Sequence, residues 1–395
     1  MTVGAVLIGH CSVDLWGLDN NTRLRRQLRA IGIVDVRLKD ETPPATDRIL
    51  IIDQRFLFEL KTLRGLLVQC NVVLTADSKG TIAAAHGDQD HLDAMLASFN
   101  QTTETGSELE FISTQSLHAY DDHLRRTEPP LLEAVSPARK GELEALLYGN
   151  SYKGITDFVT KWWWPKPARH IVAWCADHSI SANAVTLAGV VLMFSAMMLF
   201  AHGWFISGLI CGWIMTLLDT VDGKLARVTV TSSRIGHVMD HGMDIVHPPF
   251  WYVYWGLGLN LSGPLAGYDI FALNLAIVGG YIGGRLIEGA FHALGRCSMF
   301  AWRPFDAYFR LITARRNPCM VILSVATIAG RPDIGFVGIV LWTATSSLIL
   351  LGRLGYAIIE RFRHGPLHSW LEVPTAASDF PRAFAEFSGT RRAYR

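Results

Sequence analysis

Six apolar runs in the C-terminal half of the chain limit its possible folds more than any other feature. They cover residues 184–202, 204–218, 245–259, 270–284, 318–330 and 334–352. The last run has 19 residues without a charge, long enough to cross a bilayer as a helix, whereas several others need flanking residues to reach the roughly 20 that a span requires. Each run taken alone could also be a core helix of a water-soluble protein, so the connections between the runs decide.

Basic residues alternate between successive connections. They occupy the connections before the first run and after the second, fourth and sixth runs: Lys161, Lys166 and Arg169; Lys224, Arg227 and Arg234; Arg285, Arg296, Arg303, Arg310, Arg315 and Arg316; Arg353, Arg361 and Arg363. The connections after the first and third runs have no lysine or arginine, and the one after the fifth run has only Arg331. This alternation is typical of a chain that threads a membrane with its basic loops in the cytoplasm. It predicts a multi-pass protein of the cytoplasmic membrane, with six spans and both termini cytoplasmic.

The first 125 residues have a different pattern. Short apolar segments at 5–10, 48–53 and 71–77 are typical of strands, and they alternate with helix-like segments at 22–33, 56–69 and 88–99. This rhythm predicts a soluble α/β domain with a largely parallel sheet. The first residues have no basic stretch before their apolar run, so we interpret them as a core strand and not as a signal peptide.

The sequence therefore predicts four parts. These are a cytoplasmic α/β domain (1–125), a linker with an interfacial helix (126–182), a six-helix membrane domain (183–365) and a cytoplasmic tail (366–395). Trp162, Trp163 and Trp164 stand beside lysines in the linker, as is common at a membrane–water interface, although a packed soluble linker is the alternative. The six cysteines are scattered and predict neither disulfides nor a zinc site, and a net charge of +1 gives no reason to expect nucleic acid.

Four aspartates stand between the second and third apolar runs. Asp219 and Asp222 are three residues apart and Asp240 and Asp244 are four apart, so each pair lies on one face of a helix. Carboxylates at the membrane boundary need a compensating charge, and hard oxygen ligands favour Mg²⁺, Mn²⁺ or Ca²⁺ over zinc. Ion pairs with neighbouring Lys or Arg residues are the alternative.

Small residues accompany these carboxylates. Gly223 and Ala226 leave room beside the first pair and Gly236 does so beside the second, while Arg227 offers a planar cation suited to phosphate. Metal, arginine and space together indicate a site where a diphosphate undergoes displacement.

The pattern Asp-x₂-Asp-Gly-x₂-Ala-Arg-x₈-Gly-x₃-Asp-x₃-Asp resembles the signature of the CDP-alcohol phosphotransferases. Every fixed position matches: Asp219, Asp222, Gly223, Ala226, Arg227, Gly236, Asp240 and Asp244. The resemblance covers roughly residues 150–365 and implies two Mg²⁺ or Mn²⁺ ions held by Asp219, Asp222 and Asp240, with Asp244 near the metals and acting as the base for the acceptor hydroxyl. It also implies that Asp222, Gly223, Ala226, Arg227 and Gly236 bind CDP.

A second segment carries the same resemblance. Residues 181–186, SANAVT, are similar to the family's Pro-Asn-x-x-Thr, and Asn183 and Thr186 are retained. These two residues are expected to contribute to CDP binding. Ala182 replaces the usual proline, which affects the local geometry more than the chemistry.

Four arginines near the fourth and fifth runs are candidates for binding the acceptor. Arg310, Arg315 and Arg316 are close to the expected pocket mouth, and Arg285 ends an apolar run with Glu288 one turn later. Paired arginines recognise phosphate well, which favours a phosphorylated or otherwise anionic alcohol. Ordinary cytoplasmic loop charge explains the same residues without a ligand.

The N-terminal domain is similar to nucleotidyltransferases, as in enzymes that fuse an inositol-phosphate cytidylyltransferase to a di-myo-inositol-phosphate-phosphate synthase. The similar stretches are residues 17–33 and 48–67. A phosphate loop should follow the first strand, but residues 9–20 read GHCSVDLWGLDN and lack its glycines and lysine. Asp53 alone at a strand end is more typical of a cap. We expect this domain to be inactive and to serve as a scaffold, regulator or docking surface.

These observations predict an enzyme that transfers a phosphoalcohol or phosphatidyl group from a CDP-alcohol to a hydroxyl acceptor and releases CMP. The donor is CDP-diacylglycerol or a CDP-polyol, and we expect a homodimer in contact with membrane lipid. A cytidylyltransferase active through the N-terminal domain, and a membrane scaffold without activity, are the alternatives.

Overall fold

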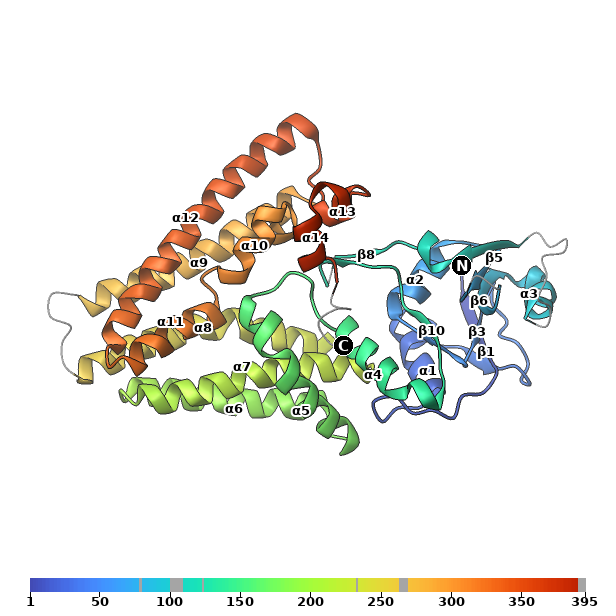
Figure 1. Ribbon diagram of the computed structural model, residues 1–395, viewed down its shortest axis with the longest axis horizontal. Coiled ribbons are helices and arrows are strands. Elements are labelled where there is room, and N and C mark those ends of the chain that lie inside the picture. Colours follow the sequence, from blue (N-terminus) through green and yellow to red (C-terminus); the bar gives the residue numbers. More distant parts are fainter. Residues whose placement is uncertain (78–79, 100–108, 123, 232–233, 263–268, 390–395) are drawn as a thin grey trace.

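The computed structural model describes residues 1–77, 80–99, 109–122, 124–231, 234–262 and 269–389, without the side chains of 234–241, 243, 244, 261 and 262. An α/β part and a helical bundle lie at opposite ends of an elongated molecule (Figure 1). The predicted combination of a helical membrane part and an N-terminal α/β domain is therefore confirmed.

The α/β domain is built on a six-stranded sheet with the order β2-β1-β3-β6-β5-β7. Its strands are β1 (Val3–Ile8), β2 (Val36–Leu38), β3 (Arg48–Asp53), β5 (Val72–Thr75), β6 (Ile82–Asp88) and β7 (Glu110–Ser113). The sheet is mixed: β1 pairs in parallel with β2 and β3, and β5 with β7, whereas β6 is antiparallel to both β3 and β5. The central strand β3 is buried from Ile49 to Asp53, as its near-continuous apolar sequence requires.

Helices cover both faces of this sheet. Helices α1 (Asn20–Ala30) and α2 (Leu60–Val68) pack on one face through Leu24 and Leu63, and α3 (Leu92–Ser98) packs on the other through Met95. The predicted helix at 56–69 begins late, and the prediction is wrong for its first residues. They form β4 (Phe56–Phe58), which is wholly buried and pairs antiparallel with β10 (Leu132–Ala134). Burial against that strand outweighs the helical spacing.

The connection to the bundle contains α4 (Lys140–Asn150), a π-helical turn (Val159–Trp163) and α5 (Pro165–Asp177). It also includes the short strands β8 (Tyr120–Asp121) and β9 (Arg126–Thr127), and 3₁₀ segments occur at Gln89–His91, Thr114–Ser116, Pro137–Arg139, Met299–Ala301 and Trp370–Glu372. Trp162 is 56% exposed and Trp163 is 50% exposed, as expected of side chains at a membrane interface.

The segment after the bundle folds back onto this connection. Helices α13 (Ala376–Asp379) and α14 (Pro381–Phe387) lie beside β8 in Figure 1. The Lys161 amine donates to the Glu386 carbonyl at 2.8 Å, and the Thr127 amide donates to the Ser388 carbonyl at 2.8 Å. A Cβ atom at Gly154 would lie only 2.3 Å from the Phe387 carbonyl oxygen, so glycine is required for this close approach.

The bundle consists of α6 (Ala182–Ala201), α7 (Phe205–Val228), α8 (Arg234–Ser262), α9 (Ile270–Leu294), α10 (Pro304–Ile312), α11 (Arg316–Ile328) and α12 (Pro332–His364). Within the described residues, α6, α7, α9 and α12 are long and apolar enough to cross a membrane. Leu187, Leu275 and Leu348 are 65–69% exposed on these helices, as lipid-facing residues would be. The protein is therefore a multi-pass membrane protein.

Each of the six predicted apolar runs lies within a helix, apart from at most two residues at an end, but the number of spans stays a prediction. Helix α11 has 13 residues and is about 20 Å long, short of the roughly 30 Å hydrocarbon core. Helix α8 has 29 residues, long enough to span, but part of it lies outside the described side chains.

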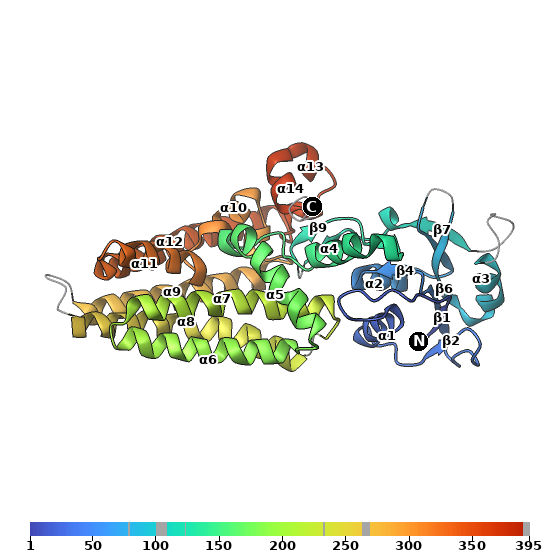
Figure 2. The same cartoon turned by 60° about the horizontal axis from the view of Figure 1, so that its bottom comes forward.

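The α/β domain holds the C-terminal end of α7. Arg23 of α1 is buried and donates to the carbonyls of Val228 and Leu15, each at 2.7 Å, and Arg26 donates to the Thr229 carbonyl at 2.8 Å. The last carbonyls of a helix lack intrahelical partners and carry partial negative charge, so the two arginines satisfy and stabilise this end. Burial lowers the pKa of Arg23 to about 10, which still leaves it charged at neutral pH. Figure 2 shows α1 at the end of the bundle where α7 terminates.

Candidate active site

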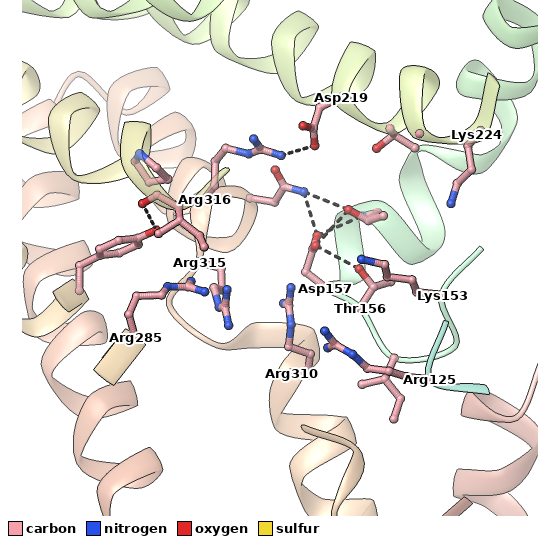
Figure 3. Close-up of a pocket in the computed structure, with 18 of the residues that line it drawn as sticks. Arg125, Lys153, Thr156, Asp157, Asp219, Lys224, Arg285, Arg310, Arg315 and Arg316 are labelled. Atoms are coloured by element: carbon pink, nitrogen blue, oxygen red, sulfur yellow. Dashed lines mark hydrogen bonds and ion pairs between the residues drawn. The ribbon is translucent and has the colours of Figure 1, made fainter. Parts of the chain in front are cut away.

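A cavity of about 220 Å³ lies between the C-terminal half of α7, the connection at residues 153–160, and the parts of α8 to α11 nearest the α/β domain. Figure 3 shows Asp219 and Lys224 of α7 on one side of this pocket and a row of arginines on the other.

Asp222 is buried on α7 and has two neutral donors. The Thr186 hydroxyl of α6 donates to Asp222 Oδ2 at 2.6 Å, and the Gly223 amide donates to Oδ1 at 2.5 Å. Ser181 places this part of α6, because its side chain caps the helix by accepting from the Ala184 amide at 3.2 Å. The structure thus brings together Thr186 and Asp222, two residues that the sequence assigned to one site.

Asp219 lies one turn earlier on α7 and lines the pocket. Arg316 Nη2 donates to Asp219 Oδ2 at 2.6 Å, and both side chains are largely buried. Arg316, which the sequence placed with the acceptor, therefore lies at the aspartate side of the pocket.

Lys224 and Arg227 are held by the connection that follows α4. The Lys224 amine donates to the Ser151 carbonyl at 3.0 Å and sits 3.5 Å from the centre of the Tyr152 ring, and Arg227 Nη1 donates to the same carbonyl at 3.2 Å. A Cβ atom at Gly223 would approach Arg227 Nη2 to 3.3 Å, so the glycine makes room for this guanidinium. Lys224 was not among the predicted site residues because it occupies a variable position of the motif.

The opposite wall is formed by Arg285, Arg310 and Arg315. Glu288 of α9 forms ion pairs with Arg315 and, at 3.6 Å, with Arg285. Arg310 projects into the pocket from α10, and burial lowers its pKa. The structure therefore brings these three predicted acceptor residues to the same pocket as Asp219.

The third wall comes from residues that sequence reasoning missed. Asp157 accepts from the Thr160 amide at 3.0 Å and from Asn317 Nδ2 of α11 at 3.0 Å, which ties the connection to the bundle. Lys153 and Arg125 also line the pocket. Their positions carry no periodicity or motif, since long-range packing alone brings them to α7.

The described lining residues are strongly basic. Eight are Lys or Arg and two are acidic: Arg125, Lys153, Lys224, Arg227, Arg285, Arg310, Arg315 and Arg316 against Asp157 and Asp219. A confined pocket with such an excess attracts anions.

Several predicted residues are not part of this wall or lie outside the described residues. Asn183 is exposed near the start of α6, and it is not among the described residues that line the cavity. The same is true of Thr186, Asp222 and Ala226. The backbone at positions 236, 240 and 244 belongs to α8, but the side chains of Asp240 and Asp244, and the surroundings of Gly236, lie outside the described part of the structure.

The predicted metal site is therefore represented by two of its four carboxylates. Among the described side chains, no group of three or more His, Cys, Asp or Glu residues is arranged to hold a metal ion. Asp219 and Asp222 supply hard oxygen atoms from one helix face, and this donor set fits Mg²⁺ or Mn²⁺.

A family match covers this part of the chain. Residues 179–278, which include α6, α7 and α8, match the CDP-alcohol phosphatidyltransferase family. Cholinephosphotransferase 1 of Gallus gallus is 30% identical over 127 residues, which cover 29% of this chain and 36% of that protein. The chain thus spans about a third of the length of this relative.

The two similarities agree with the geometry of the pocket. The matched segment contains the helices that bring Asp219 to a basic cavity within a multi-pass bundle, and the likeness to this family and to the cholinephosphotransferase supports phosphoalcohol transfer in lipid synthesis. The likeness of the N-terminal domain to nucleotidyltransferases stays a prediction.

Proposed function

We propose that this protein transfers a phosphoalcohol or phosphatidyl group from a CDP-alcohol to a hydroxyl acceptor, with release of CMP. The observation that carries the proposal is the placement of Asp219 of α7 in a pocket lined by eight basic side chains, with Asp222 buried one turn later on the same helix. A diphosphate donor needs both features, since cations neutralise its charge and carboxylates hold the metal.

Residues of α6 to α8 would bind the donor. Asp219 and Asp222 would hold one or both of two Mg²⁺ or Mn²⁺ ions, and Asp240 and Asp244 of α8 are predicted to complete the set. The bound metal would neutralise the charge that develops on the transferring phosphate. The Arg227 guanidinium lies against Gly223, where it would meet a phosphate that approaches this turn of α7, and Thr186 fixes the orientation of Asp222.

Further residues are assigned to the donor by the sequence alone. Asn183, Ala226 and Gly236 are predicted to border the CDP group. Their small or neutral polar side chains would exclude little space there, and mutation to larger residues should raise the KM for the donor.

In the reaction, the acceptor oxygen forms a bond to the phosphorus that bears the donor alcohol, and the bond from that phosphorus to the CMP oxygen breaks. Asp244 is predicted to take the hydroxyl proton, and CMP leaves with the bonding electron pair. Arg227 and Arg316, which lie at the aspartate side of the pocket, would stabilise the negative charge on the diphosphate before transfer and on CMP afterwards.

The acceptor would enter at the side formed by Arg285, Arg310 and Arg315, which lies across the pocket from Asp219 (Figure 3). Arg316 pairs with Asp219 and could contact either substrate. Several guanidinium groups on this side favour an acceptor that is itself anionic, such as a phosphorylated alcohol.

The proposal extends to the donor, the orientation in the membrane and the oligomeric state. The donor is CDP-diacylglycerol or a CDP-polyol, the pocket opens to the cytoplasm, where both termini lie, and the enzyme is a homodimer. The alternation of basic connections supports this orientation. The α/β domain is an inactive relative of nucleotidyltransferases that holds the end of α7 in place.

The test is CMP release by the full chain in lipid nanodiscs, with each CDP-alcohol in turn and with Mg²⁺, Mn²⁺ or EDTA. Metal-dependent CMP release that is lost in Asp219→Asn and retained in Asp269→Asn supports the proposal; Asp269 caps α9 away from the pocket. Consumption of CTP with pyrophosphate release would support a cytidylyltransferase instead. Neither activity with any donor would support a scaffold.

A further inference from the structure

Arg125 enters the pocket from outside the bundle. It belongs to the segment before α4, more than 50 residues ahead of the region that matches the family, which begins at residue 179. Its backbone has a φ of +50°, in the left-handed region that residues other than glycine seldom adopt. Such a conformation persists only where the surrounding structure enforces it, and it is enriched at functional sites.

The next residue provides that enforcement. Arg126 is 1% exposed, and its guanidinium donates to the Asn150 carbonyl and to Asn150 Oδ1, both at 3.0 Å. The Gly154 amide donates to the Leu124 carbonyl at 2.9 Å on the other side. Because Arg126 is anchored away from the pocket, the backbone turns so that Arg125 points into it.

Arg125 and Arg310 point into the same part of the pocket, opposite Asp219 (Figure 3). Arg310 Nη1 is buried without a hydrogen-bond partner in the described structure. Arg315 stands beside them, and its ion pair with Glu288 uses the nearest carboxylate on that wall. Burial lowers the pKa of both Arg125 and Arg310. At Arg310 the charge of Asp157 opposes this effect and the charge of Arg125 adds to it, but within the described residues neither arginine forms an ion pair.

Buried cations that lack a carboxylate of their own are costly unless a ligand supplies the negative charge. The donor diphosphate does not fill this role in the proposed reaction, because it belongs at the aspartate side. We propose that Arg125 and Arg310 form a binding site for a phosphate monoester on the acceptor alcohol. The assignment of this phosphate to the acceptor alcohol rests on the proposed function. The existence of an anion site at these two arginines does not.

The site makes the connection before the bundle a determinant of specificity. A phosphate monoester carries close to two negative charges and three acceptor oxygens at neutral pH, and two planar guanidinium groups can each bind it in bidentate fashion. A neutral alcohol would offer the same arginines no negative charge. The acceptor could be a soluble polyol phosphate or a lipid with a phosphate headgroup, since both offer the same chemistry.

The first experiment measures binding without turnover. Inorganic phosphate is titrated into the purified full chain in nanodiscs, using wild type, Arg125→Gln, Arg310→Gln, Arg125→Lys and the control Arg296→Gln. Arg296 is exposed and does not line the pocket among the described residues. We expect the Kd for phosphate to rise at least tenfold in both pocket Gln variants, by a smaller factor in Arg125→Lys, and not at all in Arg296→Gln.

Two competitors then identify the source of the phosphate. Displacement by glycerol 3-phosphate but not by glycerol or phosphatidic acid supports a soluble acceptor, and displacement by phosphatidic acid supports a lipid headgroup. Phosphate binding that is absent from wild type, or equal in wild type and in properly folded Arg125→Lys and Arg310→Gln, would overturn the inference. Arginine-dependent phosphate binding without CMP release from any donor would retain the anion site and reject the proposed function.

Discussion

Replacement of Asp222 by asparagine should abolish activity and leave the fold intact. The Asp222 carboxylate accepts from the Gly223 amide and from the Thr186 hydroxyl, which also lies 3.1 Å from the Ala182 carbonyl. An asparagine can keep this arrangement: its oxygen accepts from Gly223, its amide donates to Thr186, and the hydroxyl hydrogen turns to Ala182. Among the contacts of Asp222 that the structure describes, the substitution thus removes a charge and no hydrogen bond.

The expected loss follows from that charge. A neutral amide costs less to bury than a carboxylate, so the unfolding temperature should stay level or rise slightly. A metal acting as a Lewis acid contributes several kcal/mol to the transition state. If Asp222 holds about half of that contribution, kcat should fall at least 100-fold, equivalent to about 2.7 kcal/mol. The assay is single-turnover CMP release in nanodiscs at saturating Mn²⁺, with thermal unfolding measured on the same samples.

Thr186→Val is the matched control. It keeps the carboxylate and removes a hydrogen bond to a charged group, worth about 1.5–3 kcal/mol of folding stability. This variant should therefore lose more stability and less activity than Asp222→Asn. If Asp222→Asn keeps more than a tenth of the wild-type rate, or if the two variants lose activity in proportion to stability, the assignment of Asp222 to the metal is wrong.

Three further predictions use other parts of the chain. Asp244→Asn should lower turnover by a factor of about 10²–10⁴ and retain donor and Mn²⁺ binding, whereas Asp219→Asn should weaken Mn²⁺ binding. If titrations show an equal loss of Mn²⁺ affinity in both variants, Asp244 is chiefly a metal ligand. Arg23→Gln should lower the free energy of unfolding by about 3 kcal/mol and reduce CMP release, and Arg26→Gln should lower it by less than about 1 kcal/mol. Full activity in a destabilised Arg23→Gln protein would show that catalysis does not depend on this contact at the end of α7. Purified residues 1–125 should release no pyrophosphate from CTP or other NTPs with a sugar or inositol phosphate, and measurable release would show that the α/β domain is active.

Local patterns in the sequence predicted the elements well. The apolar runs lie in helices, and the spacing of Asp219 and Asp222 places both on one side of α7 as expected. Spacing was misleading at Phe56–Phe58, where a partner strand more than 70 residues away in sequence outweighs local helical preference. The antiparallel strand β6 in the middle of the sheet likewise depends on pairing that no short window reveals.

The pocket was predictable where its residues belong to one motif. Arg285, Arg310 and Arg315 could be suggested from charge alone, but nothing in the sequence distinguished them from ordinary loop arginines. Arg125 and Lys153 could not be found, because they reach α7 through packing between separate parts of the chain.

The return of α14 onto the connection has a consequence for how the protein is made. Residues 153–157 contribute to a pocket wall. Phe387 packs against Gly154 in this segment, Glu386 and Ser388 bind the neighbouring Lys161 and Thr127, and all three leave the ribosome after every helix of the bundle. Synthesis of α6 to α12 therefore precedes completion of the wall. A nascent chain already inserted in the bilayer would hold its aspartates beside an unfinished pocket. A fusion partner that displaces α14 should likewise disturb the position of Lys153, although it is attached more than 200 residues later in the sequence.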